Sequence, residues 1–270
     1  MRIRRLGWAG LELEVDGESA VVDLFEDASA LEPFVGPPHG PLPAPAAAGT
    51  IATALVTHLH SDHADPAAIA AALRPEGLLL RPAPAPAGGP LENGALVLAE
   101  QGIAEREIST QTVEPWESVT RGPFTFIAVP AVDGFGDPQV SWAIEAGGVR
   151  ILHAGDTIFH GSWWLTKLRL GTFDAVFLPV NGPRVSLPHR QPPSPFAAAM
   201  DPQQAAVAAA ILGARLAVPI HYDTLNGPPL YEQVDGPAAS FLAAAREAGV
   251  TARVLETGET LELEAAATPA

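Results

Sequence analysis

Three histidines and one aspartate are concentrated in the segment HLHSDH, directly after the apolar stretch 51–57, which predicts a buried strand. Alternate side chains of an extended chain project to the same side, so His58 and His60 can bind one metal ion. Asp62 and His63 follow a turn at Ser61, so they point elsewhere and can bind a second ion nearby. The alternative is a solvated polar loop, which is disfavoured because the whole chain has only 8 histidines.

Two more candidate ligands follow predicted strands. Asp156 comes after the strand 149–152, where a carboxylate can be shared between two metal ions, although the motif GDT alone is equally typical of a turn. His221 comes after the strand 215–220 and is predicted to bind the second ion. In isolation it would be interpreted as a core or surface histidine. We expect His153 to pack among strands with its ring hydrogen-bonded.

The composition indicates a globular protein and excludes several classes of function. The chain has 270 residues, of which 47% are hydrophobic and 17% are charged, and its formal net charge is -16. Such a charge disfavours partners that need a basic face, namely nucleic acid and anionic lipid. There are no cysteines, which excludes disulfides and thiolate metal sites. With neither a signal-like apolar segment nor a membrane-length stretch, the expected location is the cytoplasm. The oligomeric state stays open.

The elements that must position these residues alternate between strands and helices. The predicted strands are 11–15, 19–24, 51–57, 124–129, 140–146, 149–153, 175–178 and 215–220, with short ones near Val254 and Leu261. The predicted helices are 66–73, 162–170, 202–213 and 236–249, of which the first and third follow Asp-Pro capping signals. Segments 36–50 and 81–90 are rich in proline and alanine and predict loops.

In each half of the chain the strands come first and the helices follow. This order favours a single α/β domain over residues 1–270, built as a four-layer αββα sandwich with two mixed sheets between helices.

The order of these motifs resembles the metallo-β-lactamase superfamily of metal-dependent hydrolases. HLHSDH, the aspartate of GDT and the late strand-end histidine occur in that order, and Asp23 occupies the family's usual acidic place after the opening hairpin. The segment MDPQQAAVAAAILGARLAVPIHYDT is similar to the L-ascorbate-6-phosphate lactonase-like branch. The resemblance covers nearly the whole chain, and it implies the αββα fold with metal ions between the sheets.

The sequence departs from that family at two places. Branch members often have histidine where this chain has Asp133, and no histidine lies between His63 and His153 to replace it. Asp133 therefore either ligates in its stead or caps a turn with Gly134. Branch members also often show glycine-histidine where this chain has Gly7-Trp8.

The resemblance implies a hydrolase with two divalent metal ions, of which zinc, manganese and iron are the candidates. The expected ligands are His58, His60 and Asp133 for one ion, Asp62, His63 and His221 for the other, and Asp156 between them. Such ions lie about 3.5–4 Å apart and lower the pKa of a shared water toward about 7. The bridging hydroxide would attack a lactone, ester, amide or phosphoester bond of a small molecule. Asp62 is also the expected catalytic residue that orients the hydroxide or moves its proton.

Several alternatives stay open. The same ions would serve a phosphodiesterase acting on a nucleotide or a phospholipid headgroup, and a first site weakened by Asp133 would leave a metal-binding protein without catalysis. His160, Arg184 and His189 are candidates for substrate binding, or else surface residues. Trp163 and Trp164 are predicted to lie in the core.

Overall fold

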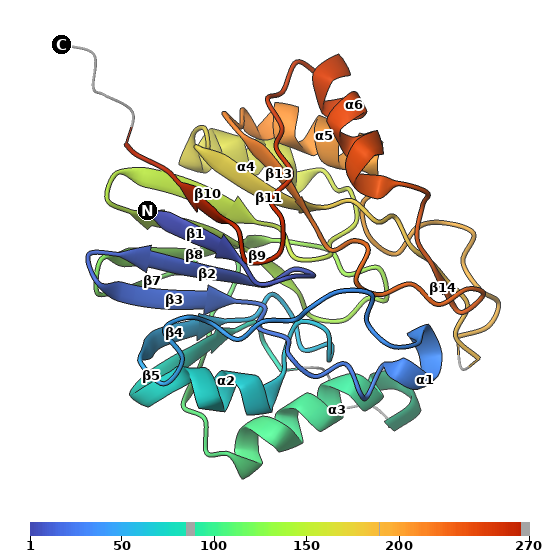
Figure 1. Ribbon diagram of the computed structural model, residues 1–270, viewed down its shortest axis with the longest axis horizontal. Helices are drawn as coiled ribbons and strands as arrows, with labels where there is room; N and C mark the ends of the chain where they lie inside the picture. The colour runs from blue at the N-terminus through green and yellow to red at the C-terminus, as the bar shows by residue number, and fades with distance from the viewer. Residues whose placement is uncertain (85–89, 189, 266–270) are drawn as a thin grey trace.

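The computed structural model describes residues 1–84, 90–188 and 190–265 and contains two large β-sheets that face each other (Figure 1). The seven-stranded sheet has the order β15-β1-β2-β3-β4-β5-β6. Its strands, in chain order, are β1 (Arg2–Arg5), β2 (Leu11–Val15), β3 (Glu18–Val22), β4 (Ile51–Leu55), β5 (Leu73–Arg81), β6 (Thr110–Thr112) and β15 (Thr260–Glu262).

The six-stranded sheet has the order β13-β11-β10-β9-β8-β7. Its strands are β7 (Ser118–Arg121), β8 (Phe124–Pro130), β9 (Val140–Ala146), β10 (Val149–His153), β11 (Ala175–Pro179) and β13 (Ala217–Ile220). A small antiparallel ribbon pairs β12 (Arg184–Val185) with β14 (Tyr231–Glu232).

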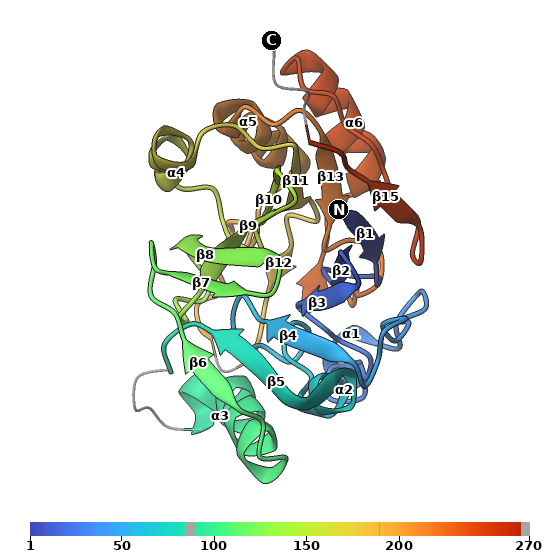
Figure 2. The ribbon, with the colours of Figure 1, turned by 90° about the vertical axis from the view of Figure 1, so that its left-hand side faces the viewer.

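Helices form the two outer layers, as expected for the αββα sandwich (Figures 1 and 2). Figure 2 shows α4 (Ser162–Leu170), α5 (Pro202–Leu212) and α6 (Pro237–Glu247) beyond the six-stranded sheet. On the opposite side, α2 (Pro66–Ala72) and α3 (Pro90–Glu105) cover the seven-stranded sheet. The short α1 (Glu32–Val35) lies at one end of the molecule. Among the described residues, none of the helices has both the length and the apolar character needed to cross a membrane.

Three buried clusters of apolar side chains fill the three interfaces between these four layers. Strand β3 shows the principle, because Ala20 and Val22 point into the cluster between the sheets, whereas Val21 points into the cluster beneath α2 and α3. The third cluster joins the six-stranded sheet to α4, α5 and α6 through side chains such as Trp163 and Phe241. Because successive side chains of a strand point to opposite faces, each strand contributes apolar side chains to the clusters on both sides of its sheet.

The capping signals locate two helices correctly. The carboxylate of Asp65 accepts hydrogen bonds from the backbone N–H groups of Ala67 and Ala68 at the start of α2. Asp201 forms a capping box with Gln204 at the start of α5, which ends at Gly213 in the left-handed conformation. Both helices begin with a proline, as predicted.

Other expectations need correction. The predicted strand near Val254 is reduced to an isolated bridge between Ala217 and Ala252. Trp163 is buried as expected, but Trp164 is 56% exposed. Successive residues of a helix lie about 100° apart, so the face of α4 that packs on the sheet cannot bury both.

One edge of the sandwich collects the ends of several strands. Strands β3, β4 and β5 are parallel to one another, as are β10, β11 and β13 in the other sheet. The predicted ligands follow β4, β8, β10 and β13. Because these strands end at the same edge, the loops that carry the ligands meet there.

Candidate metal centre

The structure brings all seven predicted ligands together in two groups. We call His58, His60, Asp133 and Asp156 the first group, and Asp62, His63 and His221 the second group; within each group the potential ligand atoms lie within 4.8 Å of one another. The grouping is the one expected from the sequence. Their role as ligands remains a proposal, which is argued below.

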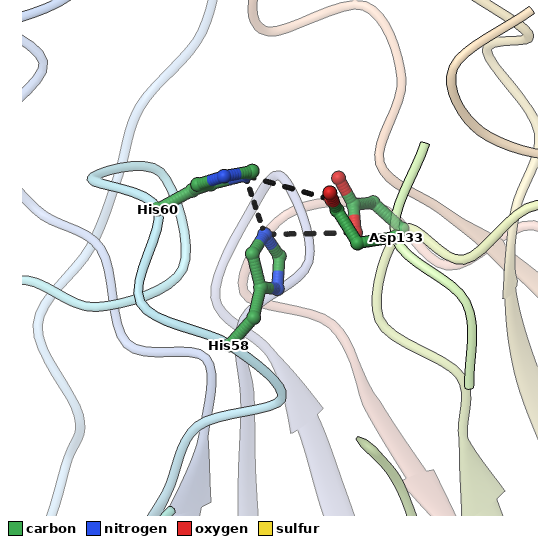
Figure 3. Close-up of side chains that lie close together, drawn as sticks. His58, His60 and Asp133 are labelled. Atoms are coloured by element: carbon green, nitrogen blue, oxygen red, sulfur yellow. Dashed lines mark hydrogen bonds and ion pairs between the residues drawn. The ribbon is translucent and has the colours of Figure 1, made fainter. Parts of the chain in front are cut away.

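The first group is open toward solvent on one side. Figure 3 shows His58 and His60 turned toward Asp133. His58 Nε2 and His60 Nδ1 are 2.9 Å apart, and His60 Nδ1 is 3.8 Å from Asp133 Oδ1. Since the two histidines use different ring nitrogens, they converge on one point although both come from the same short loop.

Asp133 is held by its own loop. Its Oδ2 accepts hydrogen bonds from the backbone N–H groups of Phe135 and Asp137, so Oδ1 is left to face the histidines. At Gly134 any side chain would collide with the backbone of Ala198, because an added Cβ would lie 2.1 Å from that carbonyl oxygen. Asp133 therefore caps a turn and also points into the centre. The two expectations for this residue are both consistent with the structure.

The second group is centred on the carboxylate of Asp62. His63 Nε2 and His221 Nε2 each lie 3.5 Å from Asp62 Oδ2. The indole of Trp8 donates a hydrogen bond to the same oxygen at 3.0 Å and its ring lies 4.0 Å from that of His221. Trp8, at the place where the family branch often has histidine, thus fixes Asp62 instead of offering another ligand.

Asp156 lies between the two groups. Its Oδ1 is 3.6 Å from His58 Nε2 and its Oδ2 is 4.0 Å from His221 Nε2, so one oxygen faces each group. Gln139 donates a hydrogen bond to Oδ1 at 2.6 Å. The preceding Gly155 has a φ of +68°, and an added Cβ would lie 2.7 Å from Thr57 Oγ1. Only glycine lets this loop approach β4 closely enough to place Asp156 there.

The four histidines of the centre share one arrangement, in which the outer nitrogen meets a supporting group and the inner nitrogen faces the other residues of the centre. Their outer nitrogens meet Thr57 Oγ1, Asp137 Oδ2, Asp23 Oδ2 and Asn181 Oδ1, for His58, His60, His63 and His221 respectively. An imidazole that donates a proton through its outer nitrogen has a lone pair on the inner one. This is the tautomer that a metal-bound histidine requires.

Buried atoms without partners indicate what the site lacks. Among the described residues, His63 Nε2, His221 Nε2 and Asp133 Oδ1 are buried and have no hydrogen-bond partner. Unsatisfied buried polar atoms are rare because they are costly, and three of the eight found among the described residues belong to the two ligand groups. Imidazole nitrogens and carboxylate oxygens are suitable ligands for zinc, manganese and iron. The residues present therefore fit divalent metal ions.

The electrostatics also favour cations. Burial disfavours protonation of His63, but the carboxylates of Asp62 and Asp23 outweigh it and raise its pKa to about 10. Burial and the neighbouring Asp156 raise the pKa of Asp133, although His60 opposes them. Carboxylates so crowded need positive charge nearby, which protons or metal ions can supply.

Most of the supporting residues are not apparent from the sequence. Asp137, Gln139 and Asn181 were not singled out, and Asp23 and Trp8 were noted without a contact being assigned. Asn181 follows β11 at the same edge as the ligands, which is a signal that would have identified it. Trp8, Asp23 and His221 all have positive φ values, namely 34°, 48° and 59°. Such conformations are costly for these residue types and concentrate at functional sites.

A cavity of about 370 Å³ opens above the centre. Its polar lining comes from His60, Asp62, Asp137, Asp156, Arg190 and His221. The remaining walls are largely apolar and include Leu31, Phe34, Leu96, Phe135, Val185, Leu187, Leu225 and Leu230. Helix α1 and strand β14, which both contribute, lie at the same end of the molecule in Figure 1.

The remaining candidates lie elsewhere. His153 is buried, with Nε2 2.7 Å from the carbonyl oxygen of Ala9, as predicted for a packed histidine. His160 stacks on Trp163 and, like the exposed Arg184, is not among the residues that line the cavity. The structure therefore gives no support to substrate binding by either residue. His189 is outside the described residues.

Comparisons with known proteins agree with the fold and the centre. The family described as "Beta-lactamase superfamily domain" matches residues 20–222. A UPF0173 metal-dependent hydrolase of Thermococcus kodakarensis is 28% identical over 229 residues, which cover 77% of this chain and 80% of that protein. Another, from Thermus thermophilus, is 33% identical over 131 residues, which are about half of either chain (48% of each).

Solved structures extend the likeness of the fold to the whole chain. The isothiocyanate hydrolase from Delia radicum gut bacteria superposes with a TM-score of 0.70 at 17% identity, covering 98% of this chain and 100% of that one. The αββα sandwich, with a centre of histidines and aspartates at one edge, is the metallo-β-lactamase fold. The chain belongs to the β-lactamase superfamily, and its relatives are named metal-dependent hydrolases. The lactonase-like branch stays a prediction.

Proposed function

We propose that the protein is a hydrolase that depends on two divalent metal ions and cleaves a small, largely apolar substrate at a lactone, ester, amide or phosphoester bond. The observation that supports this most strongly is the common orientation of the four histidines, each with its outer nitrogen engaged and its inner nitrogen directed at a carboxylate-rich centre. The names of the relatives point to the same activity.

The residues of the centre would have different roles in the reaction. The first group and the second group would each hold one ion, and Asp156 would contact both. Bound divalent cations supply Lewis acidity, which acidifies water and polarises the oxygen of the bond to be cleaved. Burial opposes ionisation of Asp62, but the imidazoles of His63 and His221 outweigh it and hold the pKa of Asp62 well below its usual value. Asp62 is therefore ionised and lines the cavity, where its carboxylate can accept a hydrogen bond from the attacking water and orient it.

The cavity favours the apolar members of the possible substrates. Arg190 is the one guanidinium in the described lining, and it is 3.8 Å from Asp137 and lies over the ring of Phe135. A phosphate group would thus find no unpaired side-chain cation in the described part of the cavity. The apolar walls can instead bury a hydrocarbon substituent of an uncharged substrate.

The test is a substrate panel with metal-depleted and metal-reconstituted protein. We expect p-nitrophenyl esters of increasing chain length and simple lactones to be hydrolysed by the reconstituted protein alone. We expect bis-p-nitrophenyl phosphate to be a poor substrate; faster cleavage of it than of any ester would favour the phosphodiesterase. Full metal content without turnover of any compound would favour a non-catalytic metal-binding protein.

A pair of matched variants controls this panel. Asp62→Asn should abolish turnover, whereas Asp16→Asn should leave it unchanged. Asp16 is an exposed carboxylate in the turn between β2 and β3, at the other end of β3 from the centre. Wild-type turnover in Asp62→Asn would mean that Asp62 has no role in the reaction.

A further inference from the structure

A hydrogen-bonded chain connects the second group to a tyrosine in the cavity wall. His221 Nδ1 lies 3.1 Å from Asn181 Oδ1, and Asn181 Nδ2 donates to the hydroxyl oxygen of Tyr231 at 2.7 Å. Asn181 is fully buried between them. The Asn181 amide is therefore shielded from solvent, and its orientation follows from its two partners.

The orientation of the Asn181 amide determines the direction of every bond in this chain. If His221 Nε2 is a metal ligand, Nδ1 must carry the proton, so it must meet the oxygen of Asn181 and not its NH₂ group. The NH₂ group is then left for Tyr231, whose oxygen accepts. The proton of the Tyr231 hydroxyl is thus not used by Asn181.

The hydroxyl proton of Tyr231 is available at the cavity. Tyr231 lines the cavity together with Asp62, Asp156 and His221. Among the hydrogen bonds of the described residues, none has the Tyr231 hydroxyl as a donor. Burial and the carboxylates of Asp62 and Asp156 raise the pKa of Tyr231 well above its usual value, so the hydroxyl keeps its proton at neutral pH.

The backbone holds Tyr231 in this position. β14 pairs with β12, in the register Tyr231 to Val185, and Tyr231 exchanges two backbone hydrogen bonds with Gly227. Gly227 in turn packs against α1, where an added Cβ would lie 2.3 Å from the Cα of Val35. The hydroxyl is therefore presented by a rigid wall, which a hydrogen-bond donor to a reacting group requires.

We propose that Tyr231 is a catalytic residue that donates a hydrogen bond to the substrate oxygen on which negative charge develops when the bond is attacked. The inference rests on the proposed function, because it assigns a partner to that reaction. No covalent step is involved: the tyrosine keeps its proton, and Asn181 fixes the direction in which it points. Loss of one such donor typically lowers kcat about 10²–10³-fold.

The first test compares the two tyrosines of the chain. Tyr231→Phe should lower kcat for a p-nitrophenyl ester by about 10²-fold, with little change in KM and unchanged metal content. The control is Tyr222→Phe, because Tyr222 is buried and its hydroxyl accepts from Arg5 away from the cavity. This control should keep wild-type kcat. A Tyr231→Phe enzyme within threefold of the wild-type kcat would overturn the proposal.

A second variant separates the donated proton from the presence of the ring. In Asn181→Asp both side-chain oxygens accept, so the new carboxylate would take the Tyr231 proton away from the cavity. We expect kcat to fall nearly as far as in Tyr231→Phe, and the double variant to be no worse than either single one. Additive losses would show that Asn181 and Tyr231 act independently, and the directed proton would be refuted.

Binding measurements keep this test distinct from the test of the proposed function. A tetrahedral phosphonate analogue of the ester should bind metal-loaded Tyr231→Phe about 10²-fold more weakly than wild type. A planar amide of the same substituent should bind both forms equally. If wild type hydrolyses nothing, the proposed function fails, and the phosphonate comparison still supports or refutes hydrogen-bond donation by Tyr231.

Discussion

The two ligand groups are supported by different parts of the molecule. The second group rests on buried side chains, since His63 contacts Asp23, His221 contacts Asn181, and Trp8 donates to Asp62. The first group rests largely on the loop that follows β8, where Asp133 is held by backbone N–H groups and His60 by Asp137, which is only partly buried. A site fixed by the core is preorganised, whereas one fixed by a loop can adjust.

The charge of the two groups differs as well. The first group has two carboxylates, Asp133 and Asp156, and the second has Asp62 alone, apart from its share of Asp156. We therefore expect the first group to prefer a harder ion, such as manganese or ferrous iron, and the second group to prefer zinc. We expect the ion of the second group to bind more tightly and to exchange more slowly.

The largest effect is expected at the residue that the two groups share. Asp156→Ala should reduce hydrolysis to background and lower the metal content at both positions, because two cations would then repel each other without a carboxylate between them. Metal analysis and ester turnover check this. Wild-type turnover with two bound ions would show that the groups do not depend on Asp156.

The next largest effect should come from the outer carboxylates, and it should differ between the groups. Loss of an outer partner typically costs about 10–100-fold in metal affinity. Asp23→Asn should lower the metal affinity of the second group by that factor, because Asp23 is fully buried and water cannot take over its contact with His63. Asp137→Asn should lower the metal affinity of the first group by a smaller factor. Competition with a chromophoric chelator gives the stepwise dissociation constants, and equal losses would contradict the difference in support.

A smaller effect is expected when Asp133 is replaced by the histidine that the family branch often has. Three carboxylates against two divalent ions leave a site charge of about +1, which would rise to about +2 in Asp133→His. Zinc affinity of the first group should rise relative to manganese affinity, and the acidic limb of the pH–rate profile should shift downward. An unchanged preference and profile would mean that Asp133 does not act as a ligand.

The smallest effect concerns a histidine outside both groups. Burial without a nearby carboxylate lowers the pKa of His160 to about 4, the opposite of the shift at His63. The unfolded chain binds this proton near pH 6.5 and the folded chain does not until about pH 4. Between these values the unfolded state binds more protons, so the contribution of His160 to stability is complete above pH 6.5 and is lost as the pH falls toward 4.

The matched variant is His160→Asn, whose amide oxygen can still accept from the backbone N–H of Ser162, as His160 Nδ1 does. From pH 8 to pH 5, wild type should lose about 1–2 kcal/mol more unfolding free energy than the variant, a figure reduced for solvent screening at a half-buried ring. Denaturant unfolding at both pH values gives the difference. A variant that loses as much as wild type would show that His160 titrates normally.

The sequence predicted the centre better than its surroundings. The residues of the two groups could be expected to cluster because each follows an apolar strand, and strand ends meet at one edge of this fold. The outer partners carry no such pattern, because a residue such as Tyr231 reaches the cavity only through the tertiary fold. Hydrogen-bond partners of ligands are thus visible in the structure but not in the spacing of residues.

The elements of the fold likewise divide into those that the sequence predicts and those that only the structure reveals. Capping residues and alternating strands were identified correctly, since their causes are local. The strand β5 and the helix α3 were not predicted. Pro75 and Gly77 lie within β5, and Gly94 and Gly102 lie within α3. Proline and glycine are both unfavourable inside regular elements, so the local sequence argues against each of these elements. Packing on the neighbouring β4 and α2 overrides these local preferences.

The most direct test of two unlike metal sites is anomalous diffraction combined with metal analysis, on protein purified without added metal. The account predicts two peaks about 3.5–4 Å apart, one among the side chains of the first group and one among those of the second, with Asp156 contacting both. It also predicts that brief chelation removes the first peak before the second. A single peak, or two peaks lost together, would contradict it.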